Sequence, residues 1–227
     1  MCGRFTITAT KAEMDDYLRN YFSITNFNID DYTPRYNASP TQNILSIISD
    51  GYNYRAGFLK WGFVPEYAKD MKFFSINSRA ETIDEKPTFK KAFLTKRCII
   101  PVDSFYEWKK KGTKKTPLRI LMKDEKIFAL AGIWNTAIIN DTKIHTFSIV
   151  TTKANDLMAN IHDRMPVILD HDKIPLWLDP TNRDPNLLKS LLVPYDDNKM
   201  TFYEVSSEVN SSRIDKPDLI NKIKVWQ

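Results

Sequence analysis

The sequence is poor in cysteine, glycine and long apolar runs, and each shortage excludes a class of protein. Its 227 residues include only two cysteines, Cys2 and Cys98, too few and too far apart for a disulfide scaffold or a C-x-x-C metal site. Six glycines against 12 prolines exclude a collagen-like or low-complexity chain. No run reaches the roughly 18 apolar residues that a membrane span needs, and the charged N-terminal region contains no apolar signal segment. We therefore expect a reduced intracellular protein, cytosolic or nuclear, with no membrane association.

The composition is that of an ordinary folded protein. Hydrophobic residues make up 42% of the chain and aromatic residues 12%, enough to bury a substantial core. We find no internal repeat, linker or composition break, so we predict a single domain over residues 1–227.

Positive charge is concentrated in one part of the chain. The formal net charge is +5, but residues 86–126 contain 13 basic and 4 acidic residues, which leaves the remainder at −4. The densest piece, KKKGTKKTP at Lys109–Pro117, is typical of a hairpin tip with Gly112 at the turn. It is either a solvated loop that protects a sheet edge or a surface that attracts a nucleic-acid backbone.

Three helices follow from capping and periodicity. Thr10 and Glu13 have capping-box spacing ahead of apolar residues at helical spacing, which predicts a helix to Phe22. A Thr cap predicts a helix over Thr152–Ile161, and Asp184 with Pro185 predicts one that runs to Leu192.

Apolar and alternating runs outnumber the helices and predict strands. The segment Tyr32–Pro40 is rich in Pro, Asn and Ser and predicts an ordered loop. Because strands and helices do not alternate, we expect an α+β fold with a curved, barrel-like, mainly antiparallel sheet flanked by a few helices. The predicted strands are Asn43–Ser49, Tyr54–Val64, Arg97–Trp108, Pro117–Met122, Lys126–Ile139, His145–Thr151 and Thr201–Val209, with a short one at Val167–Leu169.

Cys2 is the most informative candidate for chemistry. Removal of Met1 before a small residue would leave Cys2 with an amine and a thiol on adjacent carbons. The α-amine has a reference pKa of about 7.7 to 8.0, so part of it is neutral at pH 7 and can condense with an aldehyde. The thiol can then close a five-membered thiazolidine. The alternative is a frayed terminus with an incidental cysteine.

Polar residues at three other places are candidates for the site, and each of them also has a purely structural explanation. Asn77 and Arg79 lie two apart in an extended segment and would project on one side, or they belong to a polar loop. Glu107 lies among aromatic residues, where apolar surroundings raise the pKa of a carboxyl and suit it to acid or base work, or it is an edge-strand residue. His162 lies at an element junction and can move a proton near neutrality, or it is a surface residue.

Seven blocks follow one another along nearly the whole chain: MCGRF (1–5), RYNASP (35–40), WGFVPEYAKD (61–70), INSRAET (76–82), RCIIPVDSFYEWKK (97–110), SIVTTKANDLMANIHDRMPVIL (148–169) and VSSEVNSSRIDKP (205–217). In this order they resemble the SRAP family, the SOS-response-associated peptidases or abasic-site processing proteins. MCGR at the terminus together with FYEW and IHDRMP makes the resemblance specific.

The resemblance implies that Cys2, after loss of Met1, captures abasic sites in single-stranded DNA as a thiazolidine crosslink. Asn77 would orient the Cys2 amine or the opened sugar. Glu107 would move protons, and His162 would protonate the sugar oxygen as the ring opens. The same imine also permits lyase activity by β-elimination, and the peptidase activity would be limited to removal of Met1.

Seven further residues in these blocks are predicted to contact DNA. The arginines would bind phosphates, and Trp61 and Tyr67, with Phe63, would stack on bases. Tyr67 stands where a Trp is frequent in the family, and Lys86 lies near a position often occupied by Arg. The seven residues are Arg4, Arg79, Arg164, Pro40, Trp61, Tyr67 and Trp108.

The resemblance implies a role in the DNA damage and SOS response. Nothing in the sequence demands an oligomer, a cofactor or a metal, so we expect a monomer without cofactor or metal. It would be cytoplasmic and nucleoid-associated if bacterial, and nuclear if eukaryotic. Two other functions stay open, a thiol peptidase acting on other proteins and a non-catalytic single-strand binding module.

Overall fold

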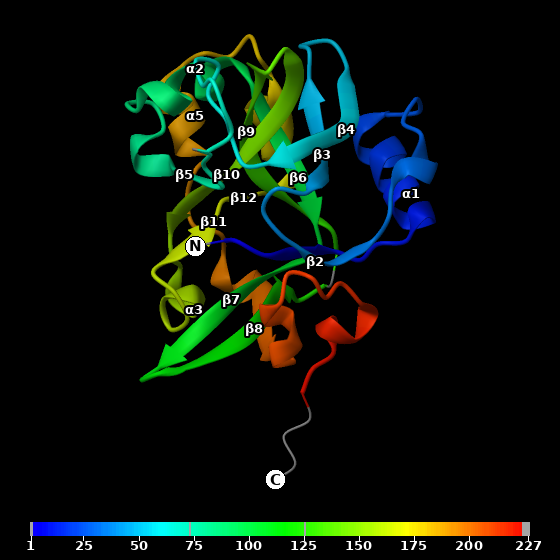
Figure 1. Ribbon diagram of the computed structural model, residues 1–227, viewed down its shortest axis with the longest axis vertical. Helices are drawn as coiled ribbons and strands as arrows, with labels where there is room; N and C mark the ends of the chain where they lie inside the picture. Colours follow the sequence, from blue (N-terminus) through cyan, green and yellow to red (C-terminus); the bar gives the residue numbers. More distant parts are fainter. Residues whose placement is uncertain (1, 73, 125, 224–227) are drawn as a thin grey trace.

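The computed structural model describes residues 2–72, 74–124 and 126–223. Two β-sheets form its frame, one above the other in Figure 1, with most of the helices around the upper sheet. The N-terminal strand runs between them, and the C-terminal segment lies beside the lower sheet. None of the described helices is both long enough and apolar enough to cross a membrane.

The lower sheet is antiparallel and contains the N-terminal strand near its middle. Its order is β13-β8-β7-β1-β2, and β1 pairs with β7 on one side and β2 on the other. The strands are β1 (Phe5–Ile7), β2 (Arg35–Ala38), β7 (Ser104–Lys111), β8 (Lys114–Met122) and β13 (Met200–Glu204).

The upper sheet closes into a barrel. The path β10-β4-β3-β6-β9 returns to its start because β9 also pairs with β10. All of these pairs are antiparallel except β4 with β10. The barrel strands are β3 (Asn43–Ser49), β4 (Tyr54–Trp61), β6 (Arg97–Val102), β9 (Phe128–Ile139) and β10 (Thr142–Lys153).

Three short strands extend the barrel sheet at its rim. β5 (Asn77–Arg79) and β11 (Arg164–Pro166) pair with β10, and β12 (Ile168–Leu169) pairs with β9. The predicted α+β fold with a barrel-like, mainly antiparallel sheet is confirmed.

The helices are short and mostly cover the outside of the barrel. They are α1 (Lys11–Phe22), α2 (Pro87–Thr95), α3 (Asp156–Ala159), α4 (Ile174–Leu178) and α5 (Pro185–Ser190), with 3-10 turns at Ile29–Asp31 (η1), Ala80–Thr82 (η2), His171–Lys173 (η3), Asp197–Lys199 (η4), Ser207–Asn210 (η5) and Pro217–Ile220 (η6). Helix α1 begins with the predicted Thr10 capping box, and Asp184 caps α5 as predicted.

Four local predictions are wrong, three of them because a long-range contact intervenes. The predicted loop at Tyr32–Pro40 contains β2, which pairs with β1. The predicted strand Arg97–Trp108 is two strands in two sheets, divided at Asp103, whose carboxylate accepts hydrogen bonds from Thr6 and Arg119.

The other two concern element ends. The helix predicted from Thr152 is shorter, because Thr152 pairs with Met165 and Asn155 is the cap of α3. The strand predicted over Thr201–Val209 ends at Glu204 and continues into η5. Helices α2 and α4 were not predicted, since neither has a side-chain cap at its N-terminus.

Candidate active site

Cys2 is held inside the protein at the junction of the two sheets. Its exposed fraction is 0%, because β1 runs directly from it into the lower sheet, where Phe5 lies opposite Phe105 and Ala38. The Cys2 carbonyl oxygen accepts a hydrogen bond from Asn77 Nδ2 at 2.9 Å. The alternative of a frayed terminus is therefore wrong. Met1, whose removal the chemistry requires, lies outside the described residues.

Burial and a nearby carboxylate both act on the Cys2 thiol. Burial raises the pKa of this thiol well above its usual value, and the negative charge of Glu107 raises it further. A backbone hydrogen bond from Arg4 opposes these effects to a smaller extent. The thiol is thus neutral at physiological pH and needs a base to become a nucleophile.

Asn77 comes from the barrel sheet and reaches the N-terminal strand. It lies on β5, opposite Ile149 of the parallel neighbour β10. While its Nδ2 binds Cys2, its Oδ1 is buried and has no hydrogen-bond partner among the described residues. An unsatisfied buried acceptor is costly, so this oxygen is well suited to accept a hydrogen from a ligand or from the Cys2 amine.

Glu107 and His162 line one groove. Glu107 lies on β7 and is only 3% exposed, while His162 follows α3 in the turn before β11. The groove has a volume of about 380 Å³ and is lined by Glu107, Trp108, Lys110, Lys115, His162 and Asn210. The four predicted catalytic residues therefore come from four separate segments. Asn77 and Glu107 both act on Cys2, and Glu107 shares this groove with His162.

The imidazole of His162 has two competing partners at one nitrogen. Nδ1 lies 3.0 Å from the Arg164 backbone N–H, which it accepts when unprotonated. It also lies 2.8 Å from Asp163 Oδ1, which needs a proton on Nδ1. Nδ1 can make only one of these contacts at a time, and which one depends on whether this nitrogen carries a hydrogen. The neighbouring residues therefore hold the ring in place in the groove with either tautomer.

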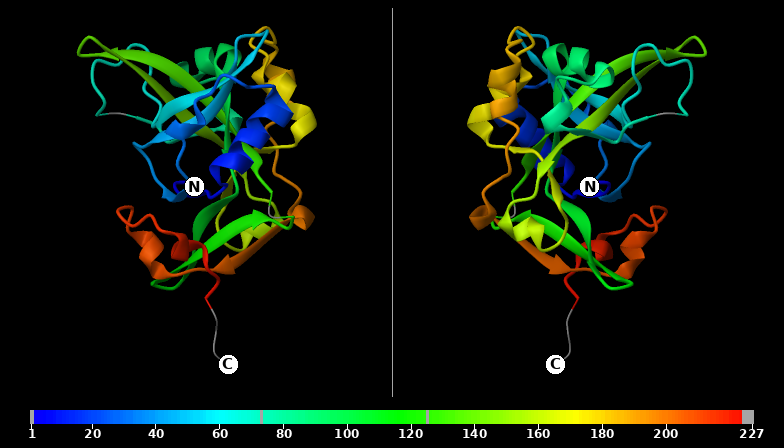
Figure 2. Two further views of the ribbon diagram at one scale, coloured as in Figure 1. Left: turned by 90° about the vertical axis from the view of Figure 1, so that its right-hand side faces the viewer. Right: turned by 90° about the vertical axis from the view of Figure 1, so that its left-hand side faces the viewer.

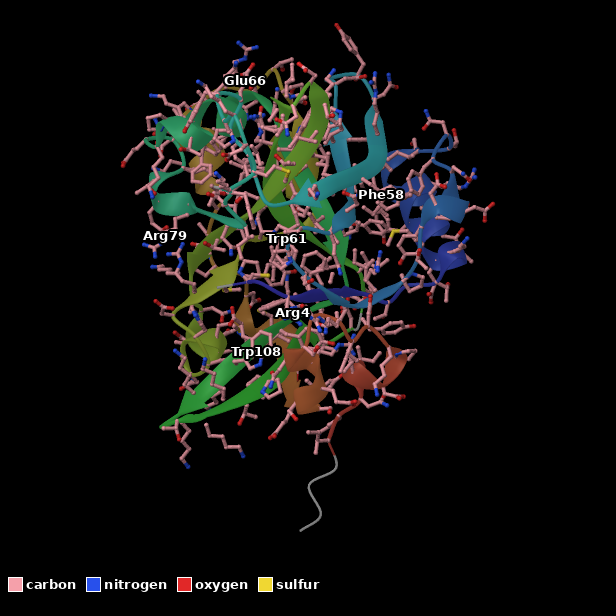
Figure 3. All side chains as sticks on the ribbon, in the orientation of Figure 1. Arg4, Phe58, Trp61, Glu66, Arg79 and Trp108 are labelled. Carbon is pink, nitrogen blue, oxygen red and sulfur yellow. The ribbon has the colours of Figure 1, made fainter. Side chains whose placement is uncertain are left out.

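Arg4 and Trp108 lie together below the N-terminal strand (Figure 3). The guanidinium of Arg4 is 5.8 Å from the Trp108 ring centroid and donates to Asn37 Oδ1 at 2.6 Å and the Val209 carbonyl at 2.7 Å. The Trp108 indole donates to Asn210 Oδ1 at 2.6 Å. Arg4 is half-buried, so much of its hydrogen-bonding capacity is used within the protein.

The other two predicted phosphate-binding arginines differ in availability. Arg79 is exposed at the end of β5 (Figure 3). The Arg164 side chain is 13% exposed, and its Nη1 and Nη2 bind the two carboxylate oxygens of Glu81 at 2.6 and 2.9 Å. A phosphate at Arg164 would therefore have to share the guanidinium with Glu81.

The prediction that Trp61 stacks on a base is not supported by its position. Its exposed fraction is 0%, and its ring packs on Phe5 at 4.7 Å between centroids and stacks with Phe147 at 6.2 Å. Its indole donates to the Ile76 carbonyl at 3.0 Å. Trp61 thus supports the strands that carry Cys2 and Asn77 from inside. Phe63 is likewise buried.

Tyr67 and Pro40 remain accessible to a ligand. Tyr67 is 69% exposed, and its hydroxyl lies 3.2 Å from Thr88 Oγ1. Pro40 is half-buried two residues after the end of β2.

Sequence reasoning missed residues whose role depends on distant contacts. Asn37 accepts from Arg4 and donates to the Ser211 and Ile214 carbonyls at 3.0 and 2.7 Å, which joins β2 to the C-terminal segment. Glu81 and Asn210 were missed as well. All three lie inside matching blocks, but nothing in their local sequence indicates their partners.

The described residues contain no group of three or more His, Cys, Asp or Glu side chains arranged to hold a metal ion. A larger cavity of about 530 Å³, lined by residues including Tyr21, His171 and Tyr195, contains none of the predicted site residues.

Comparison with known proteins gives one consistent family. The family model described as SOS response associated peptidase (SRAP) matches residues 1–212. The chain is 50% identical over 232 residues to the abasic site processing protein YoqW of Bacillus subtilis (strain 168), covering 97% of this chain and 99% of that protein. It is 30% identical over 182 residues to the abasic site processing protein YedK of Escherichia coli (strain K12), covering 78% and 79%. A crystal structure of a Bacteroides thetaiotaomicron protein superposes with a TM-score of 0.86 at 27% identity, covering 98% of this chain and all of that one.

Proposed function

This chain belongs to the SOS response associated peptidase (SRAP) family, and from that premise we propose that it processes abasic sites in single-stranded DNA by covalent capture at Cys2. The relatives that share about half of its sequence are named abasic site processing proteins. The chemistry proposed for this chain is formation of a thiazolidine between Cys2, freed of Met1, and the aldehyde of the opened sugar.

One observation carries the proposal. Asn77 Nδ2 holds the Cys2 carbonyl at 2.9 Å, and the Glu107 carboxylate acts on the thiol of the same residue. These contacts support the proposal, because a neutral amide anchors the backbone of Cys2 and a carboxylate lies close enough to act on its thiol. A pair of nucleophiles on adjacent carbons is what a two-step capture of an aldehyde requires.

The first step makes the imine. His162 donates a proton to the ring oxygen of the sugar while the C1′ hydroxyl gives up its proton to water, so that the ring opens and the aldehyde forms. The neutral Cys2 amine then attacks the aldehyde carbon. The resulting carbinolamine takes up a proton from water on its hydroxyl and loses water to give a protonated imine. Asn77 Oδ1, which has no partner among the described residues, accepts a hydrogen from the amine and fixes its direction.

The second step closes the ring. The thiol adds to the imine carbon while its proton passes to Glu107, and the former imine nitrogen becomes the ring amine. Because burial and the Glu107 charge keep the thiol protonated, a base beside it is needed at this point. A competing outcome of the same imine is loss of the 3′ phosphate by β-elimination, which ring closure prevents.

The same features disfavour a thiol peptidase that acts on other proteins. Such an enzyme needs an accessible thiolate with a lowered pKa, whereas Cys2 is buried and the pKa of its thiol is raised. A non-catalytic binding module would not need Asn77 and Glu107 beside Cys2, or His162 in the same groove as Glu107.

The test is the formation of a heat-stable adduct with a single-stranded oligonucleotide that holds one abasic site. We expect an adduct with the mature protein, none of comparable stability with Cys2→Ala, and an unchanged yield with the matched control Cys98→Ala, because Cys98 is a core residue of β6. Intact-mass analysis verifies removal of Met1. An equal adduct from Cys2→Ala would contradict the proposal.

The roles of the other residues are tested by single-turnover rates. General acid or base catalysis contributes about 100-fold or more, so Glu107→Gln and His162→Gln should slow capture by at least that factor. Their pH–rate profiles separate the two roles, because the variant that lacks the acid loses the alkaline limb and the one that lacks the base loses the acidic limb.

A further inference from the structure

The β7–β8 hairpin ends in five lysines that we call the lysine hairpin: Lys109, Lys110, Lys111, Lys114 and Lys115. All five are exposed, and the turn between them contains Gly112 at φ +59°. The register places Lys110 directly opposite Lys115 and Lys111 directly opposite Lys114.

This arrangement is unfavourable for the isolated protein. Like charges directly opposite each other on neighbouring strands are destabilising. Within the described chain none of the five has a carboxylate within ion-pair distance, whereas Lys91, Lys189 and Lys216 hold carboxylates at 2.6, 2.8 and 3.0 Å. The charge of the lysine hairpin is therefore not neutralised by the fold itself.

The hairpin begins in the candidate active site. Glu107 on β7 is two residues before Lys109, and Lys110 and Lys115 line the same groove as Glu107 and His162. The hairpin then projects from the lower end of the molecule (Figures 1 and 2). Because successive side chains of a strand face opposite sides, Lys110 and Lys115 lie on the groove face and Lys111 and Lys114 on the other face of the tip. A chain that leaves the groove in this direction meets the first pair and reaches the second by passing around the tip.

We propose that the lysine hairpin is a phosphate-binding arm that grips the DNA strand on one side of the abasic site, with Lys110 and Lys115 as the near pair and Lys111 and Lys114 as the far pair. The inference rests on the proposed function. It adds that the DNA must extend a minimum length beyond the abasic site on the side of the hairpin, and not on the other side. An anionic polymer is the partner that fits, because regularly spaced phosphates match unpaired lysines repeated along a hairpin.

The reach of the arm follows from strand geometry. From Glu107 to Lys111 the strand advances four residues, or about 13 Å. At about 3.4 Å per stacked nucleotide this spans about four nucleotides. Oligonucleotides with fewer than about four nucleotides beyond the lesion on the hairpin side should not reach the far pair.

The test uses two variants and a matched control. The variants are Lys110→Gln with Lys115→Gln, and Lys111→Gln with Lys114→Gln. The control, Lys90→Gln with Lys143→Gln, removes the same charge from exposed lysines of α2 and β10 that have no carboxylate of the described chain within ion-pair distance and do not line the groove. Binding of an intact single strand is measured against salt concentration, and capture of the abasic strand is followed separately.

The logarithm of the affinity falls with the logarithm of the salt concentration, and each phosphate contact on a single strand contributes about 0.7 to the steepness of this fall. We therefore expect each hairpin variant, which lacks two lysines, to show a fall that is less steep by about 1.4. At 0.1 M salt this corresponds to about 25-fold weaker binding. The melting temperature should stay the same or rise, because opposed charges are removed. Shortening the strand on one side of the lesion should abolish the effect of the far pair, and shortening on the other side should not.

Three results would overturn the proposal. One is that the salt dependence of the hairpin variants changes no more than that of the control. This is the result expected if the lysines only keep the tip solvated or if they bind an acidic protein. Another is an effect of the far pair that does not depend on strand length. The third is a lowered melting temperature that accounts for the loss of binding. Failure of wild-type capture with a normal hairpin effect on intact DNA would refute only the capture chemistry.

Discussion

Replacing Trp61 with phenylalanine tests whether this ring supports the site from inside or stacks on a base. The indole packs on Phe5 at 4.7 Å and donates to the Ile76 carbonyl at 3.0 Å. Phe5 lies three residues after Cys2, and Ile76 directly precedes Asn77. The variant keeps an aromatic ring in the core but removes the hydrogen bond and part of the packing.

The expected loss of stability can be built from these contacts. The Ile76 carbonyl keeps its second hydrogen bond, from the Ile149 N–H at 3.1 Å, so losing the indole bond costs about 1 kcal/mol rather than the penalty of an unsatisfied group. The phenyl ring also lacks two of the buried carbons of the indole, and the loss of their burial costs about 1.6 kcal/mol of stability. The sum of about 2.5 kcal/mol lowers the melting temperature of a chain of this size by about 5 to 10 °C.

The affinity of the Trp61 variant for an intact single strand distinguishes internal support from base stacking. Because Trp61 has no exposed surface, we expect the affinity of the folded variant at 25 °C to change by less than about twofold. Complete loss of a ring that stacks on a base costs about 1 to 3 kcal/mol, or about 5- to 150-fold in affinity, and a stacking indole replaced by the smaller phenyl ring would lose part of this. Urea unfolding and fluorescence anisotropy measure the two quantities. Unchanged stability with a large loss of affinity would refute the reasoning.

Two further predictions concern ionisable residues outside the groove. Burial lowers the pKa of His171, which stacks on Tyr21 at 4.4 Å, so the unfolded chain binds a proton here more readily than the folded one and stability is lost as pH falls through about 6.5. In urea unfolding, the stability of His171→Gln should depend less on pH over this range than that of the wild type. An identical pH dependence would contradict the lowered pKa of His171. The hydrogen bond from Arg164 lowers the pKa of Glu81 below its usual 4.5, so its contribution to stability is present above about pH 4.5 and is lost as pH falls through the lower folded-state value. Glu81→Gln should therefore be less stable than wild type at pH 7 and converge with it in acid, and a difference that grows on acidification would show that the ion pair is not its cause.

Features that depend on neighbouring residues were determined by the sequence itself. The Thr10–Glu13 capping box, the strand Asn43–Ser49 and the hairpin turn at Gly112 all appear where local pattern predicts them. The capping hydrogen bonds, the short apolar run of the strand and the positive φ each depend on only a few neighbouring residues. The seven ordered blocks likewise indicated the family, because block order is itself a property of the sequence.

Only the tertiary structure decided how the candidate residues are used. The sequence allowed Cys2 to be a frayed end, but pairing of β1 with two strands more than 30 residues away buries it. Trp61 and Arg164 have the side chains of DNA-binding residues, yet one is enclosed by Phe5 and Phe147 and the other is held by Glu81. Burial and pairing between distant segments depend on how two sheets meet, and no local pattern carries that information.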